Sequence, residues 1–206
     1  AIDSAARGKA IKKRKREPKP TQNEGPSPIS RWEFDQNLND SIGKMHGTIS
    51  GAAKLENGAL VLNGRDSFVM TASLDKDIQE KTLEAWVQLN DLSQKGSGVI
   101  GIQSTDGQIF DSIVFGEKSP QTWMAGSDTL KRSQGNDGPK ETEAQSKPIH
   151  VAITYSKDGT ITRYRKGQVY GDSYKTKSQS FEKGKSQILF GMRHGTKAEM
   201  RGILSG

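Results

Sequence analysis

The stretch Leu83-Glu-Ala-Trp-Val-Gln-Leu89 alternates apolar and polar side chains. Successive side chains of a β-strand point to opposite faces of the sheet, so a strand here would have one apolar face. That face carries Leu83, Ala85, Val87 and Leu89, and the opposite face carries Glu84, Trp86 and Gln88. The alternation predicts a strand with its apolar face on a hydrophobic core.

Short apolar runs of this kind follow one another from residue 29 onward. Gly, Asn-Gly or Asp-Gly separates them at about the 8- to 12-residue spacing of an antiparallel sandwich. Lys166-Gly167 and two Asp-Gly pairs stand between paired runs, where glycine supplies the positive φ that hairpin turns require. The region from Ser119 to Lys147 lacks this periodicity and is predicted to be a long loop. Strands are predicted near residues 31–35, 59–64, 67–71, 82–89, 98–104, 108–116, 149–156, 160–166 and 187–192.

The composition favours one all-β domain. The chain has 206 residues, of which 31% are hydrophobic and 23 are glycine, and this suits short strands and tight turns better than packed helices. It has no cysteine, which excludes disulfides, thiolate nucleophiles and cysteine-ligated zinc. No apolar run approaches the 18 or so residues of a membrane-spanning helix, so membrane insertion is not predicted.

The positive charge is concentrated at the start of the chain. Residues 1–20 hold eight Lys or Arg against Asp3 and Glu17, whereas the other 186 residues hold 23 basic and 22 acidic ones. Residues 1–28 are predicted to be a basic helical tail followed by a Pro-rich linker, and residues 29–206 the domain. Lys12-Lys-Arg-Lys-Arg16 lacks interleaved aromatics, so a specific nucleic-acid partner is not predicted.

An ordered series of segments resembles a known family. It comprises Arg31–Gly43 with His46-Gly47, Gly58–Gly64, Thr82–Val87, Ile149–Tyr155 and Tyr164–Gly167. Together they resemble laminin-G-like, concanavalin A-like domains over about residues 29–206. The resemblance implies a two-sheet antiparallel jelly-roll sandwich and a binding module.

A second set of segments resembles a narrower group of domains. Phe110-Asp111, Trp123–Asp128, Gln134–Pro139 and Phe190–Gly195 are similar to domains of large exported bacterial proteins that also carry a cytochrome c-like domain and domains of unknown function. The resemblance thus implies a monomeric domain in a longer chain of the periplasm or cell envelope. Lys166 stands where the family often has Asn. The chain stops at Gly206, where the family usually continues, so a truncated closing strand is expected.

Catalytic signatures are missing from the sequence, and a non-enzymatic function is predicted. There is no Gly-x-Ser-x-Gly or His-Glu-x-x-His motif, and Gln179 stands where a P-loop ending at Gly184-Lys185-Ser186 needs glycine. The leading hypothesis is recognition of a glycan or a protein partner. One alternative is a scaffold domain without a ligand. Another is a glycoside hydrolase that uses Asp111 with Glu117, which an even spacing would point to one face.

The predicted ligand site centres on Trp123, because a sugar ring stacks on an aromatic face. The indole lies in the irregular region, whereas Trp32 and Trp86 lie in predicted strands and are expected in or near the core. The alternative for Trp123 is that it pins the long loop to the sandwich. The other predicted ligand-binding residues are Ser127, Asp128, Arg132, Arg193 and His194.

No cofactor is predicted, although calcium is a possible ligand. The oxygens of Asn136, Asp137 and Glu141 suit calcium, which takes hard oxygen ligands and which some laminin-G-like domains bind. The three histidines, His46, His150 and His194, lack the spacing of a zinc site.

Overall fold

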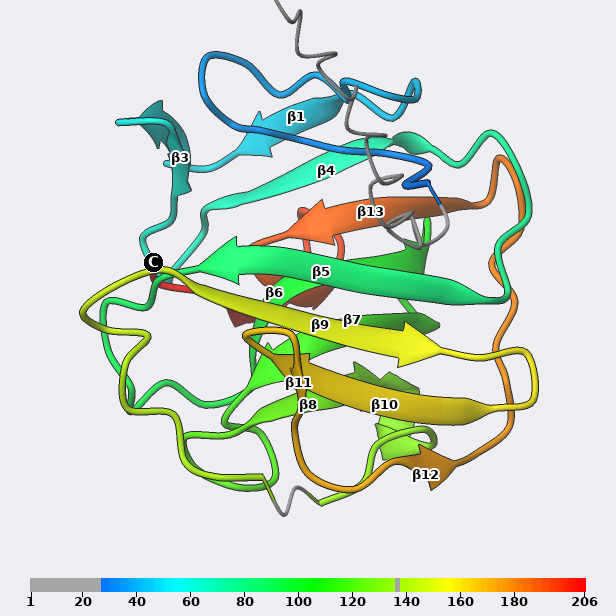
Figure 1. The fold of residues 1–206 in the computed structure, drawn as a ribbon. Helices are drawn as coiled ribbons and strands as arrows, with labels where there is room; N and C mark the ends of the chain where they lie inside the picture. Colours follow the sequence, from blue (N-terminus) through cyan, green and yellow to red (C-terminus); the bar gives the residue numbers. More distant parts are fainter. Residues whose placement is uncertain (1–26, 136–137) are drawn as a thin grey trace, which may run out of the picture.

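Two antiparallel sheets pack face to face in the computed structural model, which describes residues 27–135 and 138–206 (Figure 1). The six-stranded sheet has the order β1 (Gly47–Ser50), β4 (Phe68–Ser73), β13 (Ser186–Phe190), β6 (Ser97–Ser104), β7 (Phe110–Phe115), β8 (Trp123–Ser127). The five-stranded sheet has the order β11 (Gln168–Val169), β10 (Thr160–Arg165), β9 (Ile149–Tyr155), β5 (Lys81–Val87), and β12 (Tyr174–Lys175) also pairs with β10. The predicted two-sheet sandwich is therefore confirmed. Two short hairpins complete it: β2 (Lys54–Glu56) with β3 (Ala59–Val61), and β14 (Met192–Gly195) with β15 (Met200–Ile203).

The main core lies between the two sheets. On β5 the predicted inward residues Leu83 and Val87 are each 6% exposed, and Leu89 beyond the strand is fully buried. They belong to one cluster with Ile153 of β9 and Phe115 of β7. Burying a side chain of this size stabilises the fold by about 1.5–3 kcal/mol. The alternation in the sequence thus sets the orientation of β5.

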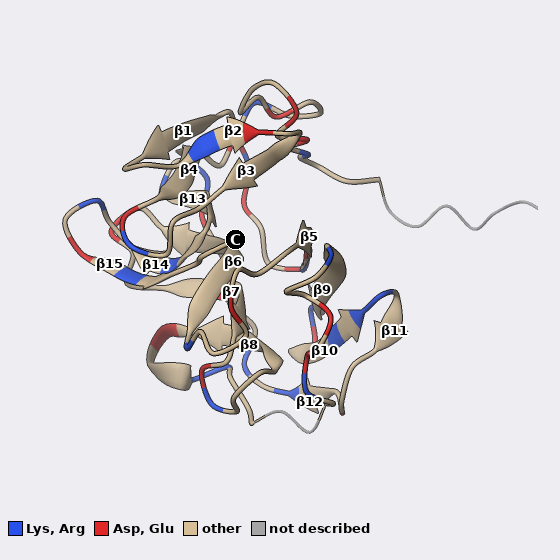
Figure 2. Ribbon diagram, turned by 90° about the vertical axis from the view of Figure 1, so that its left-hand side faces the viewer, with Lys and Arg blue, Asp and Glu red and all other residues tan. Residues whose placement is uncertain are grey.

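The outer faces of the two sheets differ. The β14–β15 hairpin covers the six-stranded sheet, on the side away from β5, β9 and β10 (Figure 2). A second apolar cluster of Phe68, Leu189 and Met192 lies on that side. Gly98 of β6 allows the close approach, since a Cβ there would lie 2.2 Å from the backbone of Arg193. The outer face of the five-stranded sheet instead carries exposed Trp86 and Val169.

Strand β5 ends the five-stranded sheet, and within residues 27–135 and 138–206 it pairs with β9 alone. The amide of Lys166 donates to the carbonyl of His150, so the backbone groups of His150 point to β10 and away from its partner Trp86. The backbone groups of Trp86, and of Glu84 two residues earlier, therefore point to the open edge. Beyond the strand, the amide of Asn90 donates to the carbonyl of Ser205 at 3.1 Å.

Most predicted strands are present, but two predictions are wrong. Residues 31–35 form no strand, and the amide at their start, that of Arg31, donates to the carboxylate of Asp40. The same carboxylate accepts the amides of Ile42, Gly43 and Met45 in the following loop. The region predicted to be one long loop contains β8. Both faces of β8 are buried, so it shows no alternation.

Two boundary predictions stay open. The predicted basic helix falls within residues 1–26, outside the described residues. Near the other end of the chain, Gly206 exchanges both backbone hydrogen bonds with Leu62. The predicted truncation of a closing strand stays a prediction.

Candidate functional site

The outer face of the five-stranded sheet presents three rows of side chains across its strands. One row holds Thr82, Thr154 and Thr162, and the next holds Glu84, Ala152, Tyr164 and Val169. The third row holds Trp86 and His150, with Lys166 beyond them in the turn after β10. Each row spans strands far apart in the sequence, so the register of the ladders creates this face.

Trp86 is the most exposed large hydrophobic residue of the described chain, with 73% of its surface accessible. Its indole lies against the imidazole of His150, with ring centroids 5.4 Å apart and planes inclined by 53°. The Nε2 atom of His150 also lies 3.5 Å from the carboxylate of Glu84. Trp86 thus offers an exposed ring face next to two polar side chains, His150 and Glu84, that contact each other.

Further planar and charged groups border this ring. The amide of Gln88 donates from Nε2 to the carbonyl of Gln145 at 3.3 Å. Lys166 and Gly167 both have positive φ, the conformation of the predicted tight hairpin turn, and Lys166 Nζ donates to Glu143 at 2.7 Å. Glu143 has a pKa lowered beyond the usual carboxylate range, first by its contact with Lys147 and then by Lys166 and Arg165.

The predicted ligand contact at Trp123 is wrong, because that side chain is only 2% exposed. Its ring packs against Phe115 with centroids 4.7 Å apart, and Nε1 donates to Glu141 at 2.8 Å. The alternative interpretation, that Trp123 pins the region after it to the sandwich, describes this geometry. The expectation that Trp86 lies in or near the core is also wrong. Trp32 is near the core, where it packs edge-on against Phe190.

Three other predicted ligand residues belong to a buried network. Ser127 Oγ accepts the amide of Arg132, and the guanidinium of Arg132 contacts Asp128 at 2.6 Å and Asp111 at 2.8 Å. Lys81 of the other sheet contacts Asp111 at 2.8 Å. The side chains of Lys81, Asp111 and Arg132 are 6%, 1% and 7% exposed. These residues hold the two sheets together and do not form an open site.

The protonation of this network follows from its burial and pairing. Burial lowers the pKa of Lys81, and the carboxylate of Asp111 acts in the opposite direction. Burial also opposes the charge of Arg132, but Asp111 and Asp128 outweigh it and raise the pKa of Arg132. Asp111 lies 2.8 Å from both Lys81 and Arg132, so one carboxyl group lies between the two basic groups.

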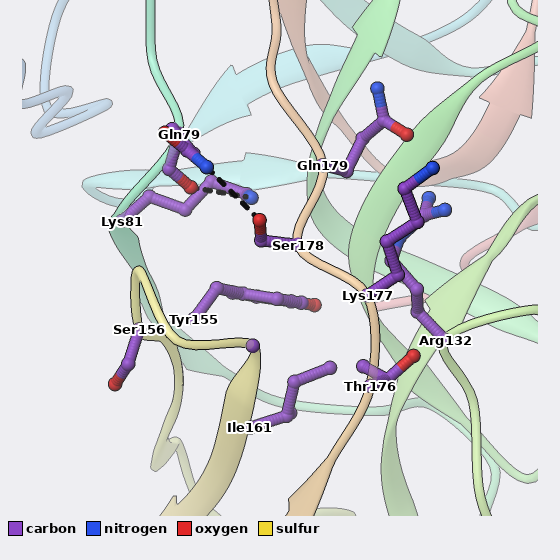
Figure 3. A pocket seen from close by; sticks show the side chains of 11 residues that line it. Gln79, Lys81, Arg132, Tyr155, Ser156, Ile161, Thr176, Lys177, Ser178 and Gln179 are labelled. Atoms are coloured by element: carbon purple, nitrogen blue, oxygen red, sulfur yellow. Dashed lines mark hydrogen bonds between the residues drawn. The ribbon is translucent and has the colours of Figure 1, made fainter.

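Lys81 and Arg132 of the network also line a small cavity (Figure 3). Lys81 and Tyr155 point from β5 and β9 toward the segment with Thr176 and Ser178, and Gln79 Nε2 donates to Ser178 at 3.0 Å. The cavity volume is about 10 Å³, about the space of one water molecule. It is too small for a sugar ring.

Arg193 and His194 lie on β14, on the outer side of the six-stranded sheet. Arg193 forms an ion pair with Glu117, and the imidazole of His194 stacks on Phe110 with centroids 4.1 Å apart. Burial lowers the pKa of His194, while its contact with the carbonyl of Gly107 acts in the opposite direction. Both side chains are engaged in anchoring the β14–β15 hairpin.

The predicted calcium ligands do not meet in the described residues. Asn136 and Asp137 lie outside them. Glu141 is fully buried, and its oxygens accept from Trp123, Arg165 and two backbone amides. Burial raises the pKa of Glu141, but the contacts with Arg165 and Trp123 lower it to about 2. Within residues 27–135 and 138–206, no group of three or more His, Asp or Glu is placed to hold a metal ion.

The carboxylate pair proposed for a glycosidase is not formed. Asp111 lies near the start of β7 and Glu117 lies two residues beyond its end, and the strand from residue 111 to 115 alone spans about 13 Å. Glycosidases hold their two carboxylates about 5–10 Å apart. Both side chains are also committed to ion pairs, with Lys81 and Arg132 in one case and Arg193 in the other.

Trp86 and its neighbours could have been found from the sequence. The alternation in Leu83–Leu89 already places Trp86 on the face of Glu84 and Gln88. The contribution of Tyr164 and His150 follows only from strand order.

Among the described residues there is no helix that is long and apolar enough to cross a membrane.

Comparisons with known proteins agree with this geometry at the level of the fold. A heptameric serum-amyloid-P-like pentraxin from Limulus polyphemus is 14% identical, with a TM-score of 0.52 over 78% of this chain and 71% of that one. The carbohydrate-binding module CBM66 from Bacillus subtilis is 13% identical, with a TM-score of 0.44 over 69% of this chain and 86% of that one. An endo-β-galactosidase from Clostridium perfringens is 10% identical, with a TM-score of 0.44 over 80% and 58%.

No curated protein sequence matches the chain. The likeness to the pentraxin has a TM-score above 0.5 but an identity below 25%, and therefore it shows the fold alone. The family model for the concanavalin A-like lectin/glucanases superfamily matches residues 63–206, more than two thirds of the chain. The chain therefore belongs to the concanavalin A-like lectin/glucanases superfamily.

Proposed function

We propose that this protein is a non-catalytic glycan-binding module and that the glycan lies on the outer face of the five-stranded sheet. The observation that carries the proposal is the 73% exposed Trp86, held on a rigid strand. A large exposed aromatic ring favours the apolar face of a sugar. Planar polar side chains beside it, from Glu84, Gln88 and His150, suit the sugar hydroxyls.

The composition of this face supports a glycan more than a protein partner. Trp86 and Val169 are the only large exposed hydrophobic residues on its strands in the described chain. Stable protein interfaces bury about 800 Å² on each partner around an apolar centre. One indole and one valine in a setting of threonines fall short of such a centre.

The same face does not present a free pair of carboxyl groups in the described residues, because Glu143 at its border is paired with Lys147, Lys166 and Arg165. Among the outward residues of β5, β9 and β10, only Glu84 has a carboxylate. Glycoside hydrolysis needs two carboxyl groups on either side of the bond. Binding without cleavage is therefore the function that this surface supports. Export to the cell envelope, which the family resemblance implies, stays a prediction.

The test is a glycan array on the whole chain, followed by calorimetry on the glycans that bind. Trp86→Ala is expected to lower the affinity about tenfold, equivalent to about 1.4 kcal/mol. Ile42→Ala is the matched control, since Ile42 is 49% exposed on the N-terminal loop, away from the face. An affinity that survives Trp86→Ala would place the glycan elsewhere. An array without any binding would instead favour the scaffold alternative.

A further inference from the structure

We infer that the ligand is a neutral, linear oligosaccharide of about three sugar units that crosses the strands from β5 to β11. This inference rests on the proposed function and deepens it. It distinguishes recognition along a glycan chain from recognition of one terminal sugar.

The apolar contacts on the face extend across four strands. Trp86 of β5 lies opposite His150 of β9, and Tyr164 of β10 lies opposite Val169 of β11. His150 and Tyr164 are diagonal neighbours, because Tyr164 pairs with Ala152. The four side chains form a band, from Trp86 to Val169, that runs across the sheet.

The band is longer than one sugar. From β5 to β11 there are three strand spacings, which gives about 14 Å. One pyranose ring is about as wide as one spacing, so a single sugar on Trp86 would leave Tyr164 and Val169 without contact. Val169 is 63% exposed and is otherwise unexplained by the packing of the sandwich.

The surface along the band is continuous and has hydroxyl groups beside it. Ala152 of β9 lies between Glu84 and Tyr164, next to His150 on the same face, and is only 6% exposed, so neighbouring side chains close over it. Along one side runs the threonine row of Thr82, Thr154 and Thr162. Thr162 Oγ lies 2.7 Å from Ser173 Oγ. Hydroxyls at regular strand spacing suit a ligand that presents hydroxyls at a similar repeat.

The charges near the band favour a neutral ligand. Glu84 lies beside His150 at 3.5 Å, and Lys166 donates to Glu143 at 2.7 Å. Two charged groups that border the band, Glu84 and Lys166, thus each lie against another ionisable side chain. An acidic glycan would have to compete with Glu143 for Lys166 and would meet Glu84. We therefore expect no preference for uronic acids or sulfated sugars.

The experiment measures affinity against chain length by calorimetry on the whole chain. The probes are β-1,4- and β-1,3-linked gluco-oligosaccharides of one to six units, the corresponding series of any other neutral glycan that binds on the array, and an oligogalacturonate series. For a neutral series, affinity is expected to rise up to about three units and then level off. The oligogalacturonates are expected to bind no more tightly than neutral chains of the same length.

Variants locate the chain on the face. Trp86→Ala is expected to weaken binding at every length, whereas Tyr164→Ala is expected to weaken only chains of two units or more, by several-fold. Ile42→Ala serves again as the control, and thermal melting checks that each variant is folded. The two levels of the proposal then fail separately. Affinity that is already maximal for one sugar and insensitive to Tyr164→Ala would overturn the inference and leave the proposed function standing, while binding to no glycan would overturn both.

Discussion

At the residue scale, the structure buries side chains that the sequence predicts to contact a ligand and exposes a tryptophan that it predicts to lie in or near the core. Trp123 and Arg132 look like ligand contacts in a polar region, yet both are buried and bonded within the protein. Trp86, in a regular strand, is exposed. A polar group without a partner is costly in the interior, so polar residues inside the sandwich must pair with one another. The Lys81–Asp111–Arg132 cluster meets that requirement.

Asp111→Asn is predicted to be strongly destabilising. It would remove the negative charge between two buried cations, and breaking a buried pair in this way costs about 3–5 kcal/mol. Urea unfolding followed by tryptophan fluorescence measures the change. Glu117→Gln is the matched control, since its ion pair with Arg193 is about one-fifth exposed and its loss should cost less. An equal or larger loss for Glu117→Gln would contradict the assigned importance of the cluster.

Glu141 is predicted to make the free energy of unfolding depend on pH in the acid range. Its pKa falls from 4.5 to about 2 on folding, as the contacts with Arg165 and Trp123 outweigh burial. A depressed carboxyl pKa contributes stability that is present above about pH 4.5 and is lost as the pH falls toward 2. Urea midpoints measured from pH 6 to pH 2.5 should therefore fall less steeply in Glu141→Gln than in the native chain. Parallel curves would contradict this role, and Glu56→Gln, with an exposed carboxylate, is the control.

At the scale of elements, β5 connects the core to the proposed site. Its inward side chains belong to the main hydrophobic cluster, and its outward face presents Glu84 and Trp86. At the start of the strand, Lys81 forms an ion pair with Asp111 of the other sheet. The strand pairs with β9 on one side alone among the described residues. A strand that is buried on one face and bonded on one edge can hold an indole rigidly in solvent, which is what ring stacking with a ligand requires.

Amide hydrogen exchange should alternate along β5. The amides of Thr82, Glu84 and Trp86 point to the open edge, so they are predicted to exchange much faster than those of Leu83 and Ala85, which face β9. Residue-resolved exchange measured by NMR under native conditions tests this. The amides of β9, which has a partner on each side, serve as the internal reference. Uniform protection along β5 would show that its edge is covered.

At the scale of the whole molecule, charge is divided between the first residues and the sandwich. Residues 1–20 hold eight of the 31 basic residues, and the rest of the chain is nearly neutral. Polyanion binding depends on the number of phosphates contacted and on salt, with little dependence on fold. Such binding is therefore expected to be separate from any recognition on the five-stranded sheet.

Non-specific DNA binding is predicted to require residues 1–20. With eight phosphate contacts, the logarithm of affinity should fall with the logarithm of salt at a slope of roughly −7, so that binding at about 50 mM salt is largely lost by about 200 mM. Fluorescence anisotropy across a salt series measures it, and a chain that begins at Pro28 is the control. Tight binding by the shortened chain would show that the sandwich itself contacts DNA.

The sequence by itself determined the fold class, most strand positions and the face of β5 on which Trp86 lies. These are local properties, because alternation with period two and glycine in tight turns depend on neighbouring residues alone. It failed at β8, where burial on both faces removes the alternation, and at residues 31–35, where the amide of Arg31 donates to Asp40 and no strand forms. The tertiary structure alone decided the rest. Strand order brings Lys81 to Asp111 across the core, buries Trp123 on Glu141, and sets His150 beside Trp86 with Tyr164 one strand further along the same face. These contacts between distant strands depend on packing and register.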